Sequence, residues 1–285
     1  MRLAVMGDIH SNHAALRACL ASALSLGSEA FLLLGDYVSD CACPEKTLAL
    51  LRALSSRFPC LFVAGNREEY MLNHLDGADD GWRSPSSASG SLLFTFRRLA
   101  RRDFDFFRSL PIAGRFDVPG FPALEYCHGS PLNTRGNLAF GSQDAKDILA
   151  SLSSDLLVCA HTHIQGEYTH AGKRLVNPGS VGIPWRYGGK AQFAVLRSDG
   201  GPWDVTFFQI DYPRKEAVRA LHESGLYSEA CVWARLTEHA LLTGDDLTGA
   251  CLRCALEICM RTEGRAEWSR LPERCWQEAA ERLGV

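Results

Sequence analysis

Seven residues with metal-binding side chains follow short apolar runs in the first two thirds of this sequence. They are Asp8, His10, Asp36, Asn66, His128, His161 and His163. Mixtures of imidazole and carboxylate suit Mn, Fe, Zn or Ni, whereas Mg and Ca favour sites built from oxygen alone. Seven ligands are too many for one ion. We therefore expect two divalent transition-metal ions that share a carboxylate, with Mn preferred and Fe, Zn or Ni as alternatives.

Five short apolar runs must position these side chains, and each is an expected strand that ends directly before one of the motifs. The runs lie at residues 3–6, 31–34, 60–64, 122–127 and 155–160. Ligands of open α/β sheets gather at the carboxyl ends of the strands, so we expect the seven side chains to converge on one rim. A spacing of two, as in Asp8-x-His10 and His161-x-His163, lets both members of a pair project the same way from extended backbone.

Each motif alone also has a purely structural explanation. An Asp or Asn after a strand often starts a turn or caps a helix, and a single buried His is more often a hydrogen-bonded core residue than a ligand. Under that explanation, however, the ordered set GDxH, GD, GN, HG and HTH would need several coincidences at strand ends. We therefore favour a metal site.

The remaining pattern predicts an α/β domain over residues 1–211 and a helical extension over residues 212–285. Further strands are expected at 112–118, 166–170, 173–177, 191–197 and 203–209, and helices at 13–26, from 44, after 66, and at 91–101, 103–109 and 142–153. Residues 76–90 are rich in Gly, Ser, Asp and Pro and predict a loop. We expect residues 76–110, with Trp82 and the aromatic residues from Phe94 to Phe107, to form a substrate-selecting lid. The extension follows without a flexible linker, so we expect it to pack on the core. It could equally form a dimer contact or a lid over the site.

Composition excludes several classes of function. The formal charge of −3, with 22% charged and 46% hydrophobic residues, gives no reason to expect nucleic acid or an anionic membrane as the main partner. The first apolar run stops at Gly7-Asp8, which is too short for an export signal. We expect a cytoplasmic protein whose eleven cysteines are reduced. A structural zinc site at Cys251, Cys254 and Cys259 is a minor alternative to their packing on a helix face.

The motifs GDIHSN, GDYV, GNRE, CHGSP, AHTH and NPGSVG, in this order, resemble those of the calcineurin-like metallophosphoesterase superfamily. The small bacterial and archaeal phosphodiesterase branch is the most similar, and the resemblance covers residues 1–211. It implies a four-layer αββα sandwich of two mixed β-sheets and a metal-dependent phosphoric ester hydrolase. It implies one ion held by Asp8, His10, Asp36 and His163, and a second held by Asp36, Asn66, His128 and His161, with hydroxide between the ions attacking phosphorus.

Arg67 departs from the family pattern, because many members have a histidine there that protonates the leaving group. A guanidinium stays protonated at any working pH and is a poor general acid. Arg67 could instead pair with a phosphate oxygen, or form a structural ion pair with Glu68 or Glu69. We expect Asp36, Asn66, Arg67 and His128 to be the catalytic residues, and we favour diesters or activated esters as substrates. Arg135 and Arg186 are weaker candidates for phosphate contacts.

Other functions remain open for this set of motifs. A phosphomonoesterase or a protein Ser/Thr phosphatase shares the metal ligands, although the absent histidine would be a serious loss for the latter. A nuclease is disfavoured because no basic tract indicates a nucleic-acid groove. A non-catalytic binding scaffold is disfavoured because all seven ligand positions are filled. We expect a small phosphoester as the partner, with homo-oligomerisation through the helical extension left open.

Overall fold

Buried apolar runs form the first three strands of the chain. They are β1 (Arg2–Met6), β2 (Ala30–Leu33) and β3 (Cys60–Phe62). β1 pairs in parallel with β2, and β2 pairs in parallel with β3, because the helices between them return the chain to the same end of the sheet. The computed structural model describes residues 1–78 and 81–285, so residues 79 and 80 of the expected loop at 76–90 lie outside the described residues.

Two sheets, each of five strands within the described residues, contain both parallel and antiparallel pairs. Their orders are β10-β9-β1-β2-β3 and β4-β5-β6-β8-β7. In the first sheet β9 runs antiparallel to β1, and in the second β5, β6 and β8 are parallel neighbours. The later strands are β4 (Ala113–Phe116), β5 (Leu124–Cys127), β6 (Leu156–Val158), β7 (Gly166–His170), β8 (Lys173–Asn177), β9 (Ala191–Arg197) and β10 (Asp204–Ile210).

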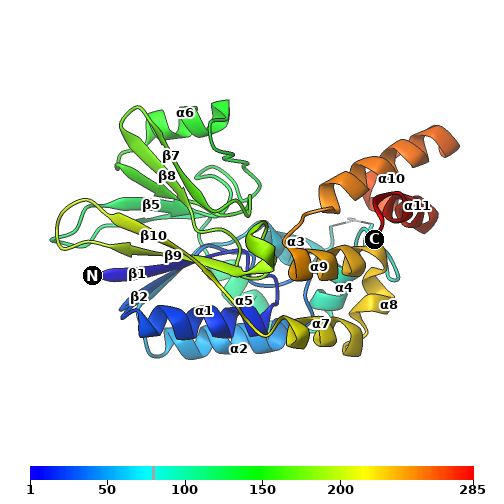
Figure 1. Cartoon of the computed structure of the whole chain (residues 1–285), viewed down its shortest axis with the longest axis horizontal. Coiled ribbons are helices and arrows are strands. Elements are labelled where there is room, and N and C mark those ends of the chain that lie inside the picture. The colour runs from blue at the N-terminus through cyan, green and yellow to red at the C-terminus, as the bar shows by residue number, and fades with distance from the viewer. Residues whose placement is uncertain (79–80) are drawn as a thin grey trace.

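Helices cover the outer faces of the two stacked sheets (Figure 1). α1 and α2 pack on the first sheet together with α5, and α6 packs on the second. Apolar side chains from both sheets, including Val5, Leu32, Leu124 and Val158, form the cluster between them. These helices and the two that precede α5 are α1 (His13–Ser25), α2 (Pro44–Ser55), α3 (Asn66–Leu75), α4 (Gly90–Phe96), α5 (Arg101–Ser109) and α6 (Gln143–Ser151). The predicted four-layer sandwich of two mixed sheets is confirmed.

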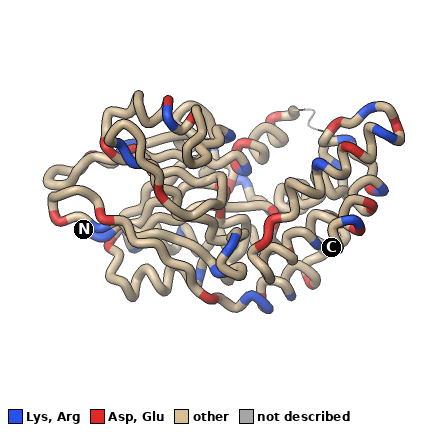
Figure 2. Tube along the Cα trace, turned by 45° about the horizontal axis from the view of Figure 1, so that its top comes forward, with Lys and Arg blue, Asp and Glu red and all other residues tan. Residues whose placement is uncertain are grey.

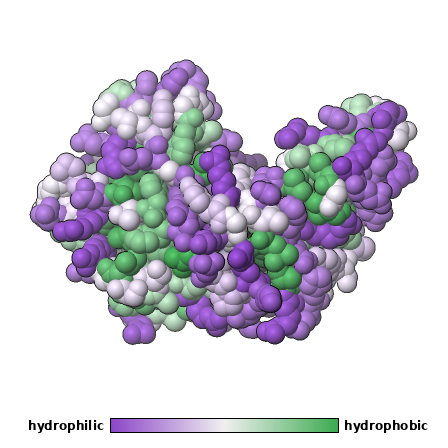
Figure 3. All heavy atoms as spheres, viewed as in Figure 1, coloured by the Kyte–Doolittle hydropathy of each residue, from purple (hydrophilic) through white to green (hydrophobic). Residues whose placement is uncertain are grey.

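The rest of the chain is helical. It comprises α7 (Arg214–Glu223), α8 (Leu226–Ala230), α9 (Val232–Thr243), α10 (Thr248–Glu263) and α11 (Glu273–Leu283). Leu221 and Leu226 share a buried cluster with Phe94 of α4. Trp276 of α11 is fully buried in a second cluster with residues of α9 and α10. The α10–α11 pair extends away from the sheets (Figure 1). The molecular surface is hollowed between this helix pair and the second sheet (Figure 3). Among the described helices, none has the length and apolar character that crossing a bilayer requires.

Candidate metal centre

Six of the candidate ligands lie in loops that follow the strands, and Asn66 is the first residue of α3. Five of the seven have a left-handed backbone. The φ angles are 52° for Asp8, 47° for His10, 51° for Asp36, 68° for His161 and 56° for His163. Residues other than glycine adopt this region at a cost of order 1–3 kcal/mol each, and they persist in it only where the surroundings enforce it. The Asp-x-His and His-x-His pairs therefore converge through tight turns, and our expectation of extended backbone there is wrong.

Backbone hydrogen bonds hold the first two turns together. The N–H groups of Ile9 and His10 both donate to the carbonyl oxygen of Asp36 at 2.8 Å, and Asp8 N–H donates to Gly35 at 3.2 Å. Gly35 has a φ of +85°, and a Cβ there would lie 2.4 Å from the backbone nitrogen of Gly65. Only glycine permits that approach, which brings the turn before Asn66 against the turn that carries Asp36.

Glu68 joins these same turns from the first turn of α3. Its carboxylate is fully buried and accepts the backbone N–H groups of Asp36 and Tyr37, both at 2.9 Å, and that of Gly65 at 2.8 Å. Burial, followed by the charge of Asp36, raises the pKa of Glu68 to about 8. Glu68 therefore fixes the backbone around two candidate ligands and does not pair with Arg67, contrary to one of our alternatives.

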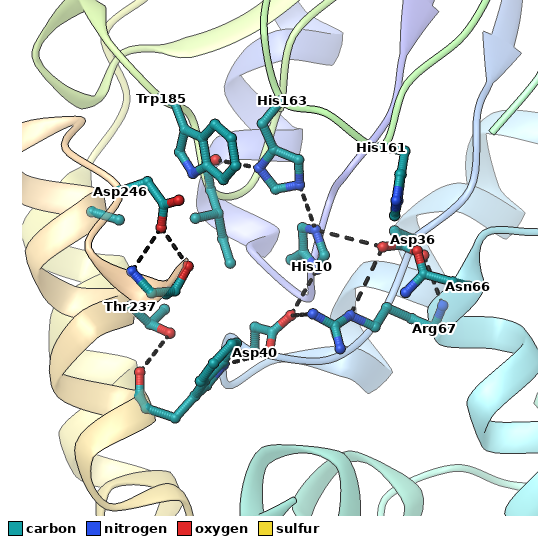
Figure 4. Close-up of a pocket in the computed structure, with 14 residues that line it drawn as sticks. His10, Asp36, Asp40, Asn66, Arg67, His161, His163, Trp185, Thr237 and Asp246 are labelled. Carbon is teal, nitrogen blue, oxygen red and sulfur yellow. Dashed lines mark hydrogen bonds and ion pairs between the residues drawn. The ribbon is translucent and has the colours of Figure 1, made fainter. Parts of the chain in front are cut away.

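The structure brings six of the candidate ligands together, five of them in two overlapping clusters and Asn66 beside the second. Figure 4 shows His10, Asp36, Asn66, His161 and His163 around the cavity that the clusters border. The ligand atoms of Asp8, His10 and His163 lie within 4.8 Å of one another, and so do those of Asp8, Asp36 and His128. Asp36 reaches both clusters, because its Oδ2 lies 3.8 Å from His10 Nε2 and its Oδ1 lies 3.5 Å from His128 Nε2. Asn66 Oδ1 lies 3.2 Å from His128 Nε2.

His161, the seventh candidate, stands beside the second cluster. Its ring centroid lies 5.1 Å from that of His128, and its backbone N–H donates to Asp8 Oδ2 at 3.0 Å. The peptide of His161 thus orients the carboxylate of Asp8, while the imidazole faces the cavity that the clusters border.

Hydrogen bonds to backbone carbonyls fix the tautomers of two histidines. His128 Nδ1 lies 2.7 Å from Leu34 O and His163 Nδ1 lies 2.8 Å from Ile183 O, so both Nδ1 atoms carry the proton. Each Nε2 then presents a lone pair to the site. His10 Nδ1 lies 3.0 Å from Asp40 Oδ2, which turns its Nε2 toward His163 Nε2 at 3.2 Å. Two lone pairs facing each other at this distance are an arrangement that a bound cation stabilises.

Burial favours the neutral imidazoles of His128, His161 and His163. It lowers the pKa of His128 and His163, and together with the neighbouring His128 it lowers that of His161 to about 4. Burial and the charge of Asp36 raise the pKa of Asp8 well above its ordinary range. Burial also acts to raise the pKa of Asp36, but His128, His10 and Arg67 together hold it below its ordinary value.

The residues present fit divalent cations. Asp8 Oδ1 is buried with no hydrogen-bond partner among the described residues, although it lies 3.5 Å from the His163 Nε2 lone pair. A buried carboxylate oxygen without a donor is costly unless a cation satisfies it. The donors are carboxylate, imidazole and amide atoms, which suit transition metals of intermediate softness.

Arg67 lies at the edge of the clusters, held by two carboxylates. Its Nη2 is 3.1 Å from Asp40 Oδ2, and its Nε is 3.8 Å from Asp36 Oδ2. Burial would raise the pKa of Asp40, but Arg67 and His10 hold it well below the ordinary value. Arg67 thus forms an ion pair, yet with Asp40 and Asp36 and not with the glutamates we had considered. Our sequence analysis missed Asp40, whose only indication was its place four residues after Asp36.

A cavity of about 180 Å³ opens beside the clusters. The residues that line it are His10, Asp36, Asp40, Asn66, Arg67, His161, His163, Ile183, Trp185, Trp233, Thr237, Ala240, Asp246 and Thr248. Within the described part of residues 76–110, no side chain lines this cavity. Phe94, Phe104 and Phe107 are buried in hydrophobic clusters instead, so the expected lid is not where we placed it.

The weaker candidates lie apart from the cavity. Arg135 is exposed and pairs with Glu69, and Arg186 is exposed in the turn after Trp185. The thiols of the predicted zinc alternative do not gather as a group of three. Cys259 lies instead with Glu263 and Cys275, whose ligand atoms are within 4.8 Å of one another, and Arg274 already pairs with that glutamate.

Comparison with known proteins gives an independent result. The sequence profile of the calcineurin-like phosphoesterase superfamily domain matches residues 1–201. An uncharacterised protein of Methanocaldococcus jannaschii is 25% identical over 239 residues, which are 79% of this chain and 93% of that protein. The match to the family profile ends before the helices that begin at α7.

Two solved structures share the fold. A hypothetical protein of Pyrococcus horikoshii OT3 superposes with a TM-score of 0.74 at 21% identity, covering 86% of this chain and 99% of that one. A metallophosphoesterase of Sphaerobacter thermophilus superposes with a TM-score of 0.68 at 22% identity, covering 86% and 100% respectively. Both alignments include more of this chain than the family profile does.

Proposed function

We propose that this chain, which belongs to the calcineurin-like phosphoesterase superfamily, uses two divalent ions to cleave a small phosphodiester. Membership of this family makes it a metal-dependent phosphoester hydrolase. Asp8, His10, Asp36 and His163 would hold one ion, and Asp36, Asn66, His128 and His161 the other. Bound ions of this kind supply an activated water and offset the negative charge on phosphate oxygens. Manganese is the metal we propose first, because the donors are imidazoles and hard oxygens without a thiolate.

The observation that supports two ions is the position of Asp36. Its two carboxylate oxygens face different histidines, His10 at 3.8 Å and His128 at 3.5 Å, which belong to different clusters. A carboxylate that spans two sets of nitrogen lone pairs can be shared between two ions. The low pKa of Asp36 keeps this group ionised and ready for that role.

Arg67 supports an ester with a stable leaving group over a general alkyl phosphate ester. Its charge is fixed, because Asp40 and Asp36 raise the pKa of the guanidinium further even though burial acts to lower it. The group lines the cavity and has N–H donors beyond those that face the two carboxylates, so it can hold a phosphate oxygen. It cannot protonate a departing alkoxide, which favours esters whose leaving group is already stable as an anion.

The size and charge of the site favour a small substrate. The cavity of about 180 Å³ is open to solvent and has room for a phosphoryl group and a short organic group. Basic and acidic residues are interspersed over both the sheets and the helices (Figure 2), unlike the single-sign surface that nucleic-acid binding requires.

The test compares an aryl phosphodiester with the corresponding monoester in the presence of manganese. We expect wild type to hydrolyse the diester faster, and Asp36→Asn to lose both activities together with bound metal. Asp117→Asn is the matched control, because Asp117 is exposed, pairs with Arg115 and does not line the cavity. A faster rate on the monoester would contradict the diester assignment, and equal rates for wild type and Asp36→Asn would contradict the two-ion site.

A further inference from the structure

The C-terminal helices supply one side of the cavity at the candidate metal centre. We call this side the helical wall, and it consists of Trp233, Thr237 and Ala240 of α9 with Asp246 and Thr248 at the start of α10. These residues lie outside the region that the family profile matches, which ends at residue 201. The helical wall is therefore a feature of this chain beyond the shared catalytic core.

Direct contacts hold the helical wall against the catalytic residues. Trp233 Nε1 donates to Asp40 Oδ1 at 2.8 Å, and the other oxygen of Asp40 contacts both His10 and Arg67. Arg186 N–H donates to Gly244 O at 2.6 Å, which ties the end of α9 to the turn after Trp185. A Cβ at Gly244 would lie 2.4 Å from the carbonyl oxygen of Arg186, so the two turns are in close contact.

Two indole rings and one carboxylate without an ion-pair partner among the described residues mark this part of the cavity. Trp185 and Trp233 offer indole rings, and Trp185 packs on His163 with ring centroids 4.9 Å apart. Asp246 Oδ1 accepts the backbone N–H of Thr248 at 2.9 Å and the hydroxyl of the same residue. In the described part of the chain, Asp246 has no ion-pair partner, and Arg67 is the one lysine or arginine that lines the cavity.

The other charges of the cavity are already compensated within the site. Arg67 faces Asp40 and Asp36, which are the other two carboxylates in the cavity lining. Asp246 uses Oδ1 to accept the hydrogen bonds from Thr248, and no hydrogen bond or ion pair within the described residues uses its Oδ2. Indole rings and a carboxylate together favour a positively charged group, since both the ring quadrupole and the anion attract it.

We propose that the helical wall and Trp185 form a subsite that selects phosphodiesters whose organic group carries a positive charge, such as an amino alcohol. This proposal rests on the proposed phosphodiesterase function. The phosphodiester would lie against Arg67 and the metal centre, and its ammonium group would face Asp246 between the indoles. A second negative charge on the substrate would be repelled by the same carboxylate.

The test uses three phosphodiesters that share the p-nitrophenyl leaving group and differ only at the second ester group. These groups are 2-aminoethyl, n-propyl and 2-carboxyethyl, which are positive, neutral and negative. In wild type with manganese, we expect kcat/KM to fall in that order, with about a tenfold or greater ratio between the first and the last. Because the ratio compares substrates on one preparation, it does not depend on the fraction of enzyme that is active.

Two variants locate the effect. Asp246→Asn should reduce the ratio of the aminoethyl to the carboxyethyl ester by about tenfold, mainly through KM. Asp245→Asn is the matched control, because this neighbour is exposed and does not line the cavity, and it should keep the wild-type ratio. Equal rates on all three esters, or an unchanged ratio in Asp246→Asn, would refute the subsite while leaving the phosphodiesterase intact. Absence of hydrolysis of every ester would refute the proposed function, and the subsite with it.

Discussion

Asp40 Oδ2 lies 3.1 Å from Arg67 Nη2 and 3.0 Å from His10 Nδ1. One buried carboxylate therefore contacts both the guanidinium of Arg67 and the imidazole of His10, a candidate metal ligand. The same carboxylate accepts the indole N–H of Trp233 through Oδ1 at 2.8 Å. Asp40 therefore connects the loops that carry the candidate ligands to α9.

Replacing Arg67 with histidine tests the assignment of Arg67 as a fixed charge. A histidine could donate a proton to the departing oxygen, which the guanidinium cannot do. We expect Arg67→His to raise the rate on alkyl phosphodiesters relative to aryl ones, measured as the ratio of the two kcat/KM values. Arg135→His, at an exposed arginine outside the cavity, is the control. An unchanged ratio in Arg67→His would show that leaving-group protonation does not limit this enzyme.

Replacing Asp40 with asparagine tests its role in positioning His10. The amide cannot neutralise Arg67, and it binds the His10 ring less strongly than the carboxylate does. Loss of such a partner behind a ligand typically costs 10–100-fold in metal affinity, so we expect a loss of about that size for manganese, measured by calorimetry. Asp211→Asn, at an exposed aspartate, should bind manganese as wild type does. Equal affinities for Asp40→Asn and wild type would remove Asp40 from the site.

Replacing Glu68 with glutamine tests how the turns of Asp36 and Asn66 are held. Glu68 accepts three backbone N–H groups, and a glutamine would turn its own N–H₂ donor toward at least one of them. A buried donor left without an acceptor costs about 1–3 kcal/mol, so we expect the free energy of unfolding of the metal-free protein to fall by about this amount. Urea unfolding at pH 9, where Glu68 with its pKa of about 8 is ionised, measures it. A change below about 0.5 kcal/mol, the range of ordinary surface substitutions, would argue against this role.

The imidazole of His161 gives the metal-free protein a defined pH dependence. Its pKa is about 4 in the folded state, against an ordinary value near 6.5 in the unfolded chain. Between these values the unfolded chain holds a proton that the folded protein does not, so this contribution to stability is lost as the pH falls from about 6.5 to about 4.

The measurement compares the unfolding of chelator-treated wild type and His161→Gln between pH 7.5 and 5. We expect wild type to lose more stability than His161→Gln over this interval, because the variant lacks the titrating group. His170→Gln, at an imidazole on β7 that does not line the cavity, should follow wild type. Parallel pH profiles for wild type and His161→Gln would show that His161 titrates normally in the folded state.

The sequence by itself determined the α/β class, the positions of nearly all strands and the candidate ligands. Apolar runs such as residues 31–34 and 60–64 predict buried strands, because their length and continuous apolar character are those of a buried strand. The strands β2 and β3 lie there. The ligand motifs were visible because each follows such a run directly. Family resemblance then supplied the second sheet and the layer order, which periodicity alone does not indicate.

Tertiary structure alone decided how the ligands meet and what surrounds them. The left-handed turns at Asp8 and His161 come from contacts with other turns, which local sequence does not encode. Asp40 and Arg67 are 27 positions apart, and Trp233 is 193 positions from Asp40, so their pairing follows from the packing of α3 and α9. The lid that we expected at residues 76–110 is wrong for the same reason, because tertiary packing and not local sequence decides which segments line the cavity. Aromatic residues of 91–110 have the composition of a lid, but burial in the core stabilises them more, and the C-terminal helices fill the open side of the site.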